Sequence, residues 1–284
     1  MSAPELQLSP GRYIAPVFDW LNTNLHGLFA FISLVIEGTL RGIESALLVV
    51  PPLVLIAAVF LLAALLIKVR VAVLAALMLA FCLGSGLWTA SMQTIALVSV
   101  SVLISVSIAF PLGILASKVK RLDAALQPVL NVMQTVPPWV YLIPAVMIFS
   151  LGRVPAIIAT VVYGIPPMLR LTTLAFKQVP RHMVELGHAM GASPRSILFK
   201  IEIPLATPTL LVGLNQCILL SLAMVVLAGL VGAGGLGAEV TRGLTRMEMG
   251  LGLRAGLAIV AVALLLDRLS RGVLDRRPQF VTAR

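Results

Sequence analysis

The 284-residue sequence has little charge, three histidines and two cysteines. Only 11% of its residues are charged, against about 25% in soluble proteins, whereas 60% are hydrophobic and the mean hydropathy is +1.06. These values exclude a protein whose main solvent is water and predict an integral membrane protein. Cys82 and Cys217 lie inside apolar runs, so we interpret them as small core residues and not as a disulfide. His182 and His188 have no metal-ligating constellation around them, and no metal site is predicted.

The sequence also lacks the motifs of a nucleotide-binding protein or an enzyme. It has no G-x-x-x-x-G-K-[ST], and no lysine follows a glycine, so it contains no P-loop for ATP. Gly232, Gly234 and Gly237 match G-x-G-x-x-G, but they close an uncharged run over 203–238 that is too long for a buried strand. No acidic residue lies about 20 positions later to hold a ribose. No basic stretch with interleaved aromatics indicates nucleic acid, and no nucleophile and base pair indicates catalysis.

Long uncharged runs indicate membrane spans, because a helix needs about 20 apolar residues to cross the hydrocarbon core. The predicted fold class is an all-α polytopic membrane protein with about seven transmembrane helices. Proline pairs are expected to interrupt two of these spans. The runs are 46–67, two within 71–117 joined by a turn near 88–94, about 131–151, 154–176, one from 205 to the glycines, and about 250–266.

The segment before the first span has a different pattern. The uncharged stretch between His26 and Glu37 is too short to cross a membrane, while apolar residues around it recur at helical spacing. This pattern predicts an amphipathic helix lying in the membrane interface. An eighth span over 20–39 with a buried glutamate is the alternative. The predicted domains are a tail with the interfacial helix over 1–45, a transmembrane domain over 46–270, and a basic tail over 271–284.

The distribution of lysine and arginine predicts the orientation. Most of these 21 residues fall on one side of the predicted spans, in the turns 68–70 and 118–121, the loop 170–200 and the C-terminal tail. By the positive-inside rule this side is cytoplasmic. The C-terminus is therefore predicted to be cytoplasmic and the N-terminus external.

A long cytoplasmic loop over 177–204 is predicted to form two short helices joined by a sharp corner. Gly191 suits the left-handed residue that ends a helix, Ser193 is a good N-cap, and Pro194 is a good first helical residue. An elbow of this size is expected to contact a partner. The alternative is that Glu185 is only a solvated loop residue.

The loop carries a recognisable motif. Permease subunits of ATP-binding-cassette (ABC) importers are marked by the motif E-A-A-x3-G-x9-I-x-L-P, where x3 and x9 are three and nine residues of any type. This sequence matches the motif at Glu185, Gly191, Ile201 and Pro204. Leucine and glycine replace the two alanines, and isoleucine replaces the leucine. Three further stretches are similar to the glycine betaine/proline/choline branch of that family: TVPPWVYLIPAVMIFSLG at 135–152, YGIPPMLRLT at 163–172 and VGAGGLG at 231–237. The resemblance covers roughly residues 46–270.

The resemblance implies a permease of the type I ABC importer kind in the bacterial inner membrane. Such a subunit pairs with a second copy, docks two cytoplasmic ATPase subunits and receives solute from an external binding protein. ATP and Mg are then bound by the ATPase, and no cofactor is expected in this chain. The implied function is ATP-driven import, by alternating access, of glycine betaine, choline, carnitine or proline betaine. The residues that would form the coupling loop are Glu185, His188, Gly191, Ala192, Ser193, Pro194, Arg195, Ile201 and Pro204.

Glycines and prolines near span ends are interpreted as a hinge or outer gate. Glycine lets helices break or approach closely, and proline removes backbone hydrogen bonds that neighbours or water must replace. Close helix packing is the alternative interpretation of the glycines. The residues assigned to the hinge or gate are Gly232, Gly234, Gly235, Gly237, Pro137, Pro138, Pro166 and Pro167.

Polar and aromatic residues within spans are candidates for the translocation path. Aromatic faces can bind a quaternary ammonium group, although aromatics near span ends also anchor helices at the interface. Uncharged polar side chains can line a path or hydrogen-bond neighbouring helices. The candidates are Trp139, Tyr141, Tyr163, Asn215, Gln216 and Ser221.

Two other transport classes are weighed against this hypothesis. An ABC permease for another small solute, such as methionine, would have the same loop motif. An ion-coupled secondary transporter would need an intramembrane acid and repeated halves, whereas the acids of this sequence lie at span ends and in loops and no repeat is visible.

Overall fold

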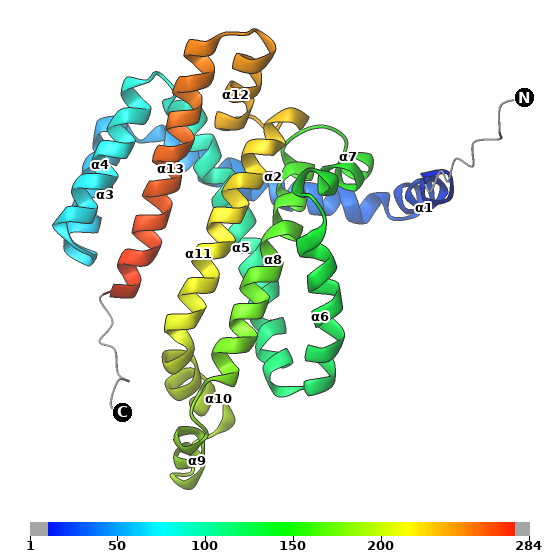
Figure 1. The fold of residues 1–284 in the computed structure, drawn as a ribbon, viewed down its shortest axis with the longest axis vertical. Coiled ribbons are helices and arrows are strands. Elements are labelled where there is room, and N and C mark those ends of the chain that lie inside the picture. The colour runs from blue at the N-terminus through cyan, green and yellow to red at the C-terminus, as the bar shows by residue number, and fades with distance from the viewer. Residues whose placement is uncertain (1–10, 276–284) are drawn as a thin grey trace, which may run out of the picture.

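The computed structural model describes residues 11–275, which form helices joined by short turns and contain no strand. The all-α membrane class predicted from the sequence is confirmed. Figure 1 shows α5, α8 and α11 at the centre of the bundle, with α9 and α10 projecting at one end and α12 at the other. The helices are α1 (Gly11–Asn24), α2 (His26–Val49), α3 (Pro52–Leu66), α4 (Val69–Gly84), α5 (Trp88–Lys118), α6 (Lys120–Thr135), η1 (Pro138–Tyr141), α7 (Leu142–Phe149), α8 (Arg153–Lys177), α9 (Arg181–Ala189), α10 (Pro194–Ile197), η2 (Leu198–Glu202), α11 (Ile203–Leu227), η3 (Ala228–Val231), α12 (Gly235–Thr245) and α13 (Met249–Asp275).

Apolar helices occupy each of the predicted span regions. Among the described residues, four helical stretches are long and apolar enough to cross a membrane: α5, α8, the continuous stretch Pro194–Val231 that contains α11, and α13. Two bent pairs also qualify, α2 with α3 at 99° and α6 with η1 and α7 at 106°. With these pairs there are up to six spans, and α4 is a shorter apolar helix. The turn expected near 88–94 lies earlier, since α4 ends at Gly84 and α5 begins at Trp88.

Proline pairs explain where two spans bend and one does not. Pro51 and Pro137 are extended, with ψ of 139° and 138°, and each precedes a proline that begins the next helix. A proline disfavours the helical conformation of the residue before it, so both pairs interrupt the chain. The prediction that Pro166 and Pro167 interrupt their span is wrong, because α8 runs through both. Both rings are buried between neighbouring helices, which hold α8 together.

The N-terminal helices lie across the rest of the bundle in Figure 1. Residues 20–39 are divided between two helices, because α1 ends at Asn24 and α2 begins at His26, and α2 forms a candidate span only together with α3. The interfacial helix and its alternative, an eighth span over 20–39, both stay predictions. Helix α2 packs against α5, α7 and α8 and buries Ile36 and Leu40. It continues to Val49, past the domain boundary expected at residue 45. Residues 271–275 of the expected tail belong to α13, and 276–284 lie outside the described residues.

Small residues bring the three central helices together. A Cβ placed on Gly113 of α5 would lie 2.6 Å from the Thr172 side chain of α8. A Cβ on Gly164 of α8 would lie 3.1–3.2 Å from side chains of α5 and α11, and one on Gly213 of α11 would lie 3.0 Å from Leu171. In lipid, helices associate through such close packing, because the surrounding acyl chains are as apolar as the side chains. These glycines therefore fix the spacing of α5, α8 and α11.

A polar contact joins α11 to α13. The Asn215 side chain is buried and donates through Nδ2 to Asp267 Oδ1 at 3.0 Å, while its Oδ1 accepts from Ser270 Oγ at 2.7 Å. Asp267 Oδ1 also accepts from Arg271 Nε at 2.7 Å. The carboxylate is thus matched by two donors within a helical bundle, where an unpaired charge would be costly. Helix α13 in turn packs against α4 and α12.

We expect Asn215→Ala to destabilise the bundle by about 1–3 kcal/mol, because it leaves buried partners without their hydrogen bonds. The measurement is the midpoint of thermal unfolding of the purified chain in detergent. The exposed neighbour provides the matched control, and Gln216→Ala should leave the midpoint within about 1 °C of wild type, as expected for surface substitutions. Equal effects of the two substitutions would contradict this account of Asn215.

Candidate functional site

The elbow between α8 and α11 has the local structure expected of it. Helix α9 ends before Gly191, whose φ of 74° is left-handed. Ser193 caps α10 by accepting a hydrogen bond from the Ser196 amide at 3.3 Å, and Pro194 is the first residue of α10. The predicted corner is confirmed, with the short helix α9 before it; the prediction of a second short helix is wrong, because α10 is the first turn of a continuous helical stretch over Pro194–Val231.

The outer surface of the elbow combines charge with exposed apolar side chains. Glu185, His188 and Arg195 are exposed to solvent. Leu186 and Met190 on α9 are 55% and 79% exposed. Figure 1 shows this part of the chain projecting beyond the helices of the bundle. An apolar surface with charged neighbours on a projecting helix is typical of a protein interaction site.

The inner surface of the elbow is fixed to the membrane helices through Gly187. A Cβ at this position would lie 2.8 Å from Ile201 Cδ1 and 3.1 Å from Ile197 Cγ1, so the glycine lets α9 pack closely on η2 and α10. Gly187 is one of the motif departures, and the close contact gives it a physical role. Because Pro194–Val231 is one continuous helical stretch, α10 and η2 of the elbow lead into α11 without a break.

Ion pairs hold neighbouring helix ends beside the elbow. Lys118, the last residue of α5, contacts Glu202 of η2 at 3.1 Å. Lys177, the last residue of α8, pairs with Asp123 of α6. Pro204, the last motif residue, lies exposed in the first turn of α11. The elbow thus lies within a framework formed by four helix ends.

The glycine turn lies at the opposite end of α11. Gly232, Gly234 and Gly235 have φ of 80°, 82° and 66°, conformations that side chains disfavour. Gly237 serves packing instead, because a Cβ there would lie 2.4 Å from the Val226 carbonyl oxygen. A Cβ on Gly229 would lie 2.2 Å from the Gly237 carbonyl carbon. Close packing, the alternative interpretation of the glycines, is therefore seen at Gly237 and Gly229, and also at Gly235, where a Cβ would lie 2.6 Å from Thr94 Oγ1. The hinge or outer gate stays a prediction.

Sequence reasoning did not identify the residues that hold this turn. Gln93 Oε1 accepts a hydrogen bond from the Gly235 amide at 3.2 Å. Thr94 Oγ1 accepts one from the Leu236 amide at 2.8 Å. These two α5 residues satisfy amides at the start of α12 that have no partner within that helix. They are 142 residues away in sequence, so no local signal indicates them.

The aromatic candidates for a path are only partly brought together. The rings of Tyr141 and Tyr163 have centroids 6.3 Å apart, and the Tyr141 hydroxyl donates to the Met133 carbonyl at 2.6 Å. Trp139 is 56% exposed in η1 and makes no ring contact with this pair. Tyr141 and Tyr163 therefore form the one aromatic pair among the three candidates.

The polar candidates on α11 face three different surroundings. Asn215 is held by the polar contact with α13, and Gln216 is exposed. Ser221 is buried where α8 approaches, since a Cβ on Gly164 would lie 3.1 Å from its Oγ. For Asn215 the geometry favours the alternative role, in which an amide hydrogen-bonds a neighbouring helix.

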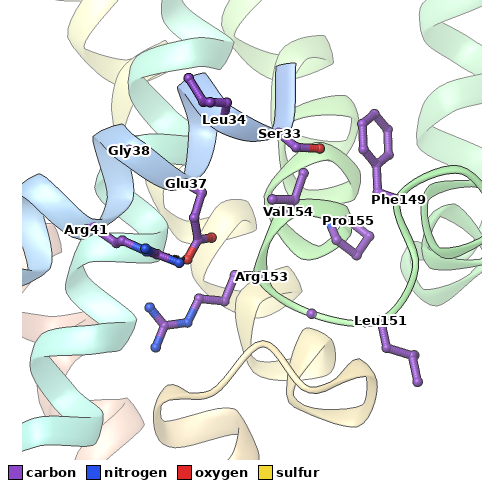
Figure 2. Close-up of a pocket in the computed structure, with 11 residues that line it drawn as sticks. Ser33, Leu34, Glu37, Gly38, Arg41, Phe149, Leu151, Arg153, Val154 and Pro155 are labelled. Carbon is purple, nitrogen blue, oxygen red and sulfur yellow. Dashed lines mark hydrogen bonds and ion pairs between the residues drawn. The ribbon is translucent and has the colours of Figure 1, made fainter. Parts of the chain in front are cut away.

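A surface hollow of about 610 Å³ lies between α2 and the connection from α7 to α8. Figure 2 shows Glu37 and Arg41 side by side on α2, with Arg153 below them at the start of α8. Glu37 Oε1 and Arg41 Nε form an ion pair at 3.0 Å. Within 11–275, no group of three or more His, Cys, Asp or Glu is placed to hold a metal ion.

Comparison with known proteins gives consistent matches. Residues 109–278 match the family described as binding-protein-dependent transport system inner membrane component. The chain is 38% identical over 262 residues to the glycine betaine/proline betaine transport system permease protein ProW of Escherichia coli, covering 92% of this chain and 74% of that protein. It is 40% identical over 257 residues to the glycine betaine transport system permease protein OpuAB of Bacillus subtilis, covering 90% of each. Among solved structures, an inward-facing conformation of the MetNI methionine ABC transporter is similar, with a TM-score of 0.55 at 25% identity over 66% of this chain and 95% of that one.

The geometry of the glycine turn predicts unequal effects of alanine. Gly229→Ala should lower the thermal unfolding midpoint strongly, because the new Cβ meets backbone that cannot move aside. Gly232→Ala should cost only about 1 kcal/mol, because nothing lies within 4 Å and the penalty is conformational. Unfolding of both variants in detergent measures the difference. If Gly232→Ala were the more damaging, the packing role assigned to Gly229 would be wrong.

Proposed function

Because the chain belongs to the binding-protein-dependent transport system inner membrane components, we propose that it is the permease subunit of an ATP-driven importer of quaternary-ammonium solutes such as glycine betaine. The observation that carries this proposal is similarity over about nine tenths of the chain to two permeases named for glycine betaine. As a membrane component of a transport system, the chain moves solute and does not catalyse a reaction.

The elbow supports coupling to a separate ATPase. The sequence contains no P-loop, so hydrolysis of ATP and binding of Mg take place in a partner. Leu186 and Met190 offer an apolar contact surface, and Glu185 adds a charge beside them. We infer that one ATPase subunit grips α9 of each permease copy, and that two copies form the pathway. The residues from Glu185 to Pro204 then transmit closure of the ATPase to α11.

The orientation follows from the position of the basic residues. Lys118, Lys120 and Lys177 lie at helix ends beside the elbow, and Arg195 and Lys200 lie within it. By the positive-inside rule this end is cytoplasmic, and the glycine turn is external, where a solute-binding protein delivers its cargo. This orientation places the start of α1 outside and the end of α13 inside a bacterial inner membrane.

Betaine-like solutes are favoured over methionine. Both permease relatives are named for glycine betaine at 38–40% identity, whereas the methionine transporter structure is 25% identical. Tyr141 and Tyr163 supply neighbouring aromatic rings, which attract quaternary ammonium cations. The external binding protein is expected to make most of the selection among glycine betaine, choline, carnitine and proline betaine.

An ion-coupled secondary transporter is less well supported. Such a transporter needs an acid that gains and loses its ion during transport. Asp267 lies inside α13, nearer the bundle than the sequence alone indicated, but its carboxylate is paired with Arg271 and hydrogen-bonded to Asn215. A carboxylate with two donors is suited to holding helices together.

The proposal predicts ATP-dependent uptake in proteoliposomes that contain the chain, its ATPase and the external binding protein. Radiolabelled glycine betaine should accumulate with ATP and should not accumulate when the ATPase carries a substituted P-loop lysine. Labelled methionine is the control solute and should remain outside. Uptake that survives loss of ATP hydrolysis would favour an ion-coupled transporter, and selective uptake of methionine would contradict the betaine assignment.

The elbow assignment predicts that Glu185→Arg reduces co-purification of the ATPase by about tenfold or more, as expected when a charge is reversed within an interface. Glu248→Arg makes the same charge change at an exposed position near the start of α13, at the opposite end of the chain's bundle, and should leave co-purification unchanged. Membrane insertion of both variants is checked by their yield in detergent. Normal recovery of the ATPase with Glu185→Arg would exclude Glu185 from the interface.

A further inference from the structure

Side chains from three separated segments meet at the external end of the bundle. Glu44 lies near the end of α2, Gln93 lies in the second turn of α5, and Arg153 is the first residue of α8. Glu44 Oε2 accepts from Arg153 Nη1 at 2.6 Å, and Glu44 Oε1 accepts from Gln93 Nε2 at 2.9 Å. Each carboxylate oxygen of Glu44 therefore has a donor from a different helix.

The environment makes this contact stronger than an ordinary surface ion pair. The side chains of Glu44 and Arg153 are 13% and 31% exposed, in contrast to the 74% exposure of Arg41 in the neighbouring Glu37–Arg41 pair. Reduced exposure to water strengthens a charged hydrogen bond and makes loss of one partner more costly.

The contact extends to the glycine turn. Gln93 donates to Glu44 through Nε2 and accepts the Gly235 amide through Oε1, so a single side chain joins the ion pair to the first residue of α12. On the other side, the Gly152 amide donates to the Val231 carbonyl at 2.9 Å. Val231, just before Gly232, is thus held by the segment that carries Arg153. Gly235, at the other end of the turn, is held by Gln93, which also contacts Glu44.

We infer that Glu44, Gln93 and Arg153 form an external latch that keeps the Gly232–Gly235 turn closed until the external partner acts. The three residues do not have to touch solute, and they act by positioning the turn. This inference rests on the proposed function, because alternating access requires the external end to open. It goes beyond that function by naming the contacts that must break.

The surroundings of the latch allow it to open. Arg153 also lines the hollow between α2 and the α7–α8 connection, so its guanidinium borders open space and can be hydrated when the pair separates (Figure 2). The turn itself has three left-handed glycines, and its conformation depends on contacts made by neighbouring helices. A contact present only in the closed state stabilises that state, so removing it shifts the population toward the open one.

The test compares Glu44→Gln with Glu37→Gln, the same change at the exposed ion pair two turns earlier on α2. In the complete importer without its binding protein, Glu44→Gln should raise the basal ATPase rate by about tenfold, as the population shifts toward the externally open state. Glu37→Gln should leave the rate unchanged. Combining Glu44→Arg with Arg153→Glu restores the ion pair but not the hydrogen bond from Gln93, because arginine has no acceptor, so it should return the rate part of the way toward wild type.

A second measurement reads the turn directly and needs no partner. Ala233 is 1% exposed, so a cysteine at that position, with Cys82 and Cys217 replaced by alanine, should react slowly with an external thiol reagent. Adding Glu44→Gln should speed the reaction by about tenfold. Gln93→Met is the second variant, for use if Glu44→Gln does not assemble. It keeps the side-chain volume and the ion pair but removes the link to Gly235, and it should also speed the reaction of the cysteine at position 233 by about tenfold.

The two measurements separate the latch from the proposed function. Uptake of glycine betaine by the wild-type importer tests the function. The basal ATPase rate and the rate of thiol reaction, each compared between variant and wild type, are measured without solute. The latch would be overturned if a variant assembled and had the same two rates as wild type. A charge-swapped double variant that stays as active as Glu44→Gln would show that pairing of the two charges is not what holds the turn.

Discussion

The close approach of α5, α8 and α11 is the constraint on which the rest of this chain depends. Lipid supplies no hydrophobic drive between helices and no partner for an exposed backbone group, so association requires contact between complementary helix surfaces. Gly113, Gly164 and Gly213 provide that contact by letting side chains of the adjacent helix occupy the space of a missing Cβ. The elbow joins two of these helices, α8 and α11, and the glycine turn follows α11 at its other end.

Charged contacts are placed to hold helix ends. Beside the elbow, Lys118 contacts Glu202 and joins α5 to the base of α11, and at the opposite end of the bundle Arg153 contacts Glu44 and joins α8 to α2. Of these two pairs, the Arg153–Glu44 pair is the one that Gln93 connects to a backbone amide of another element, α12.

The sequence predicts those features that depend on neighbouring residues in the chain. The apolar runs and the corner at Gly191 and Ser193 follow from local chemistry, and they are found where expected. Equivalent local chemistry gives different outcomes at Pro137, which bends the chain, and at Pro166, which does not, because packing by other helices decides. The partners of Glu44 come from helices remote in sequence, and the path candidates scatter because the rotation of each helix about its axis is set by tertiary contacts.

The continuity of α8 has a mechanical consequence. Its 25 residues run from Arg153 at the ion pair with Glu44 to Lys177 beside the elbow, a rod about 37 Å long at 1.5 Å per residue. If such a rod pivots by about 10° where Gly164 meets its neighbours near the midpoint, each tip sweeps an arc of about 3 Å, as long as a hydrogen bond. A small tilt imposed at the elbow would therefore be enough to part Arg153 from Glu44, with no unwinding of the helix and no relay of intermediate contacts.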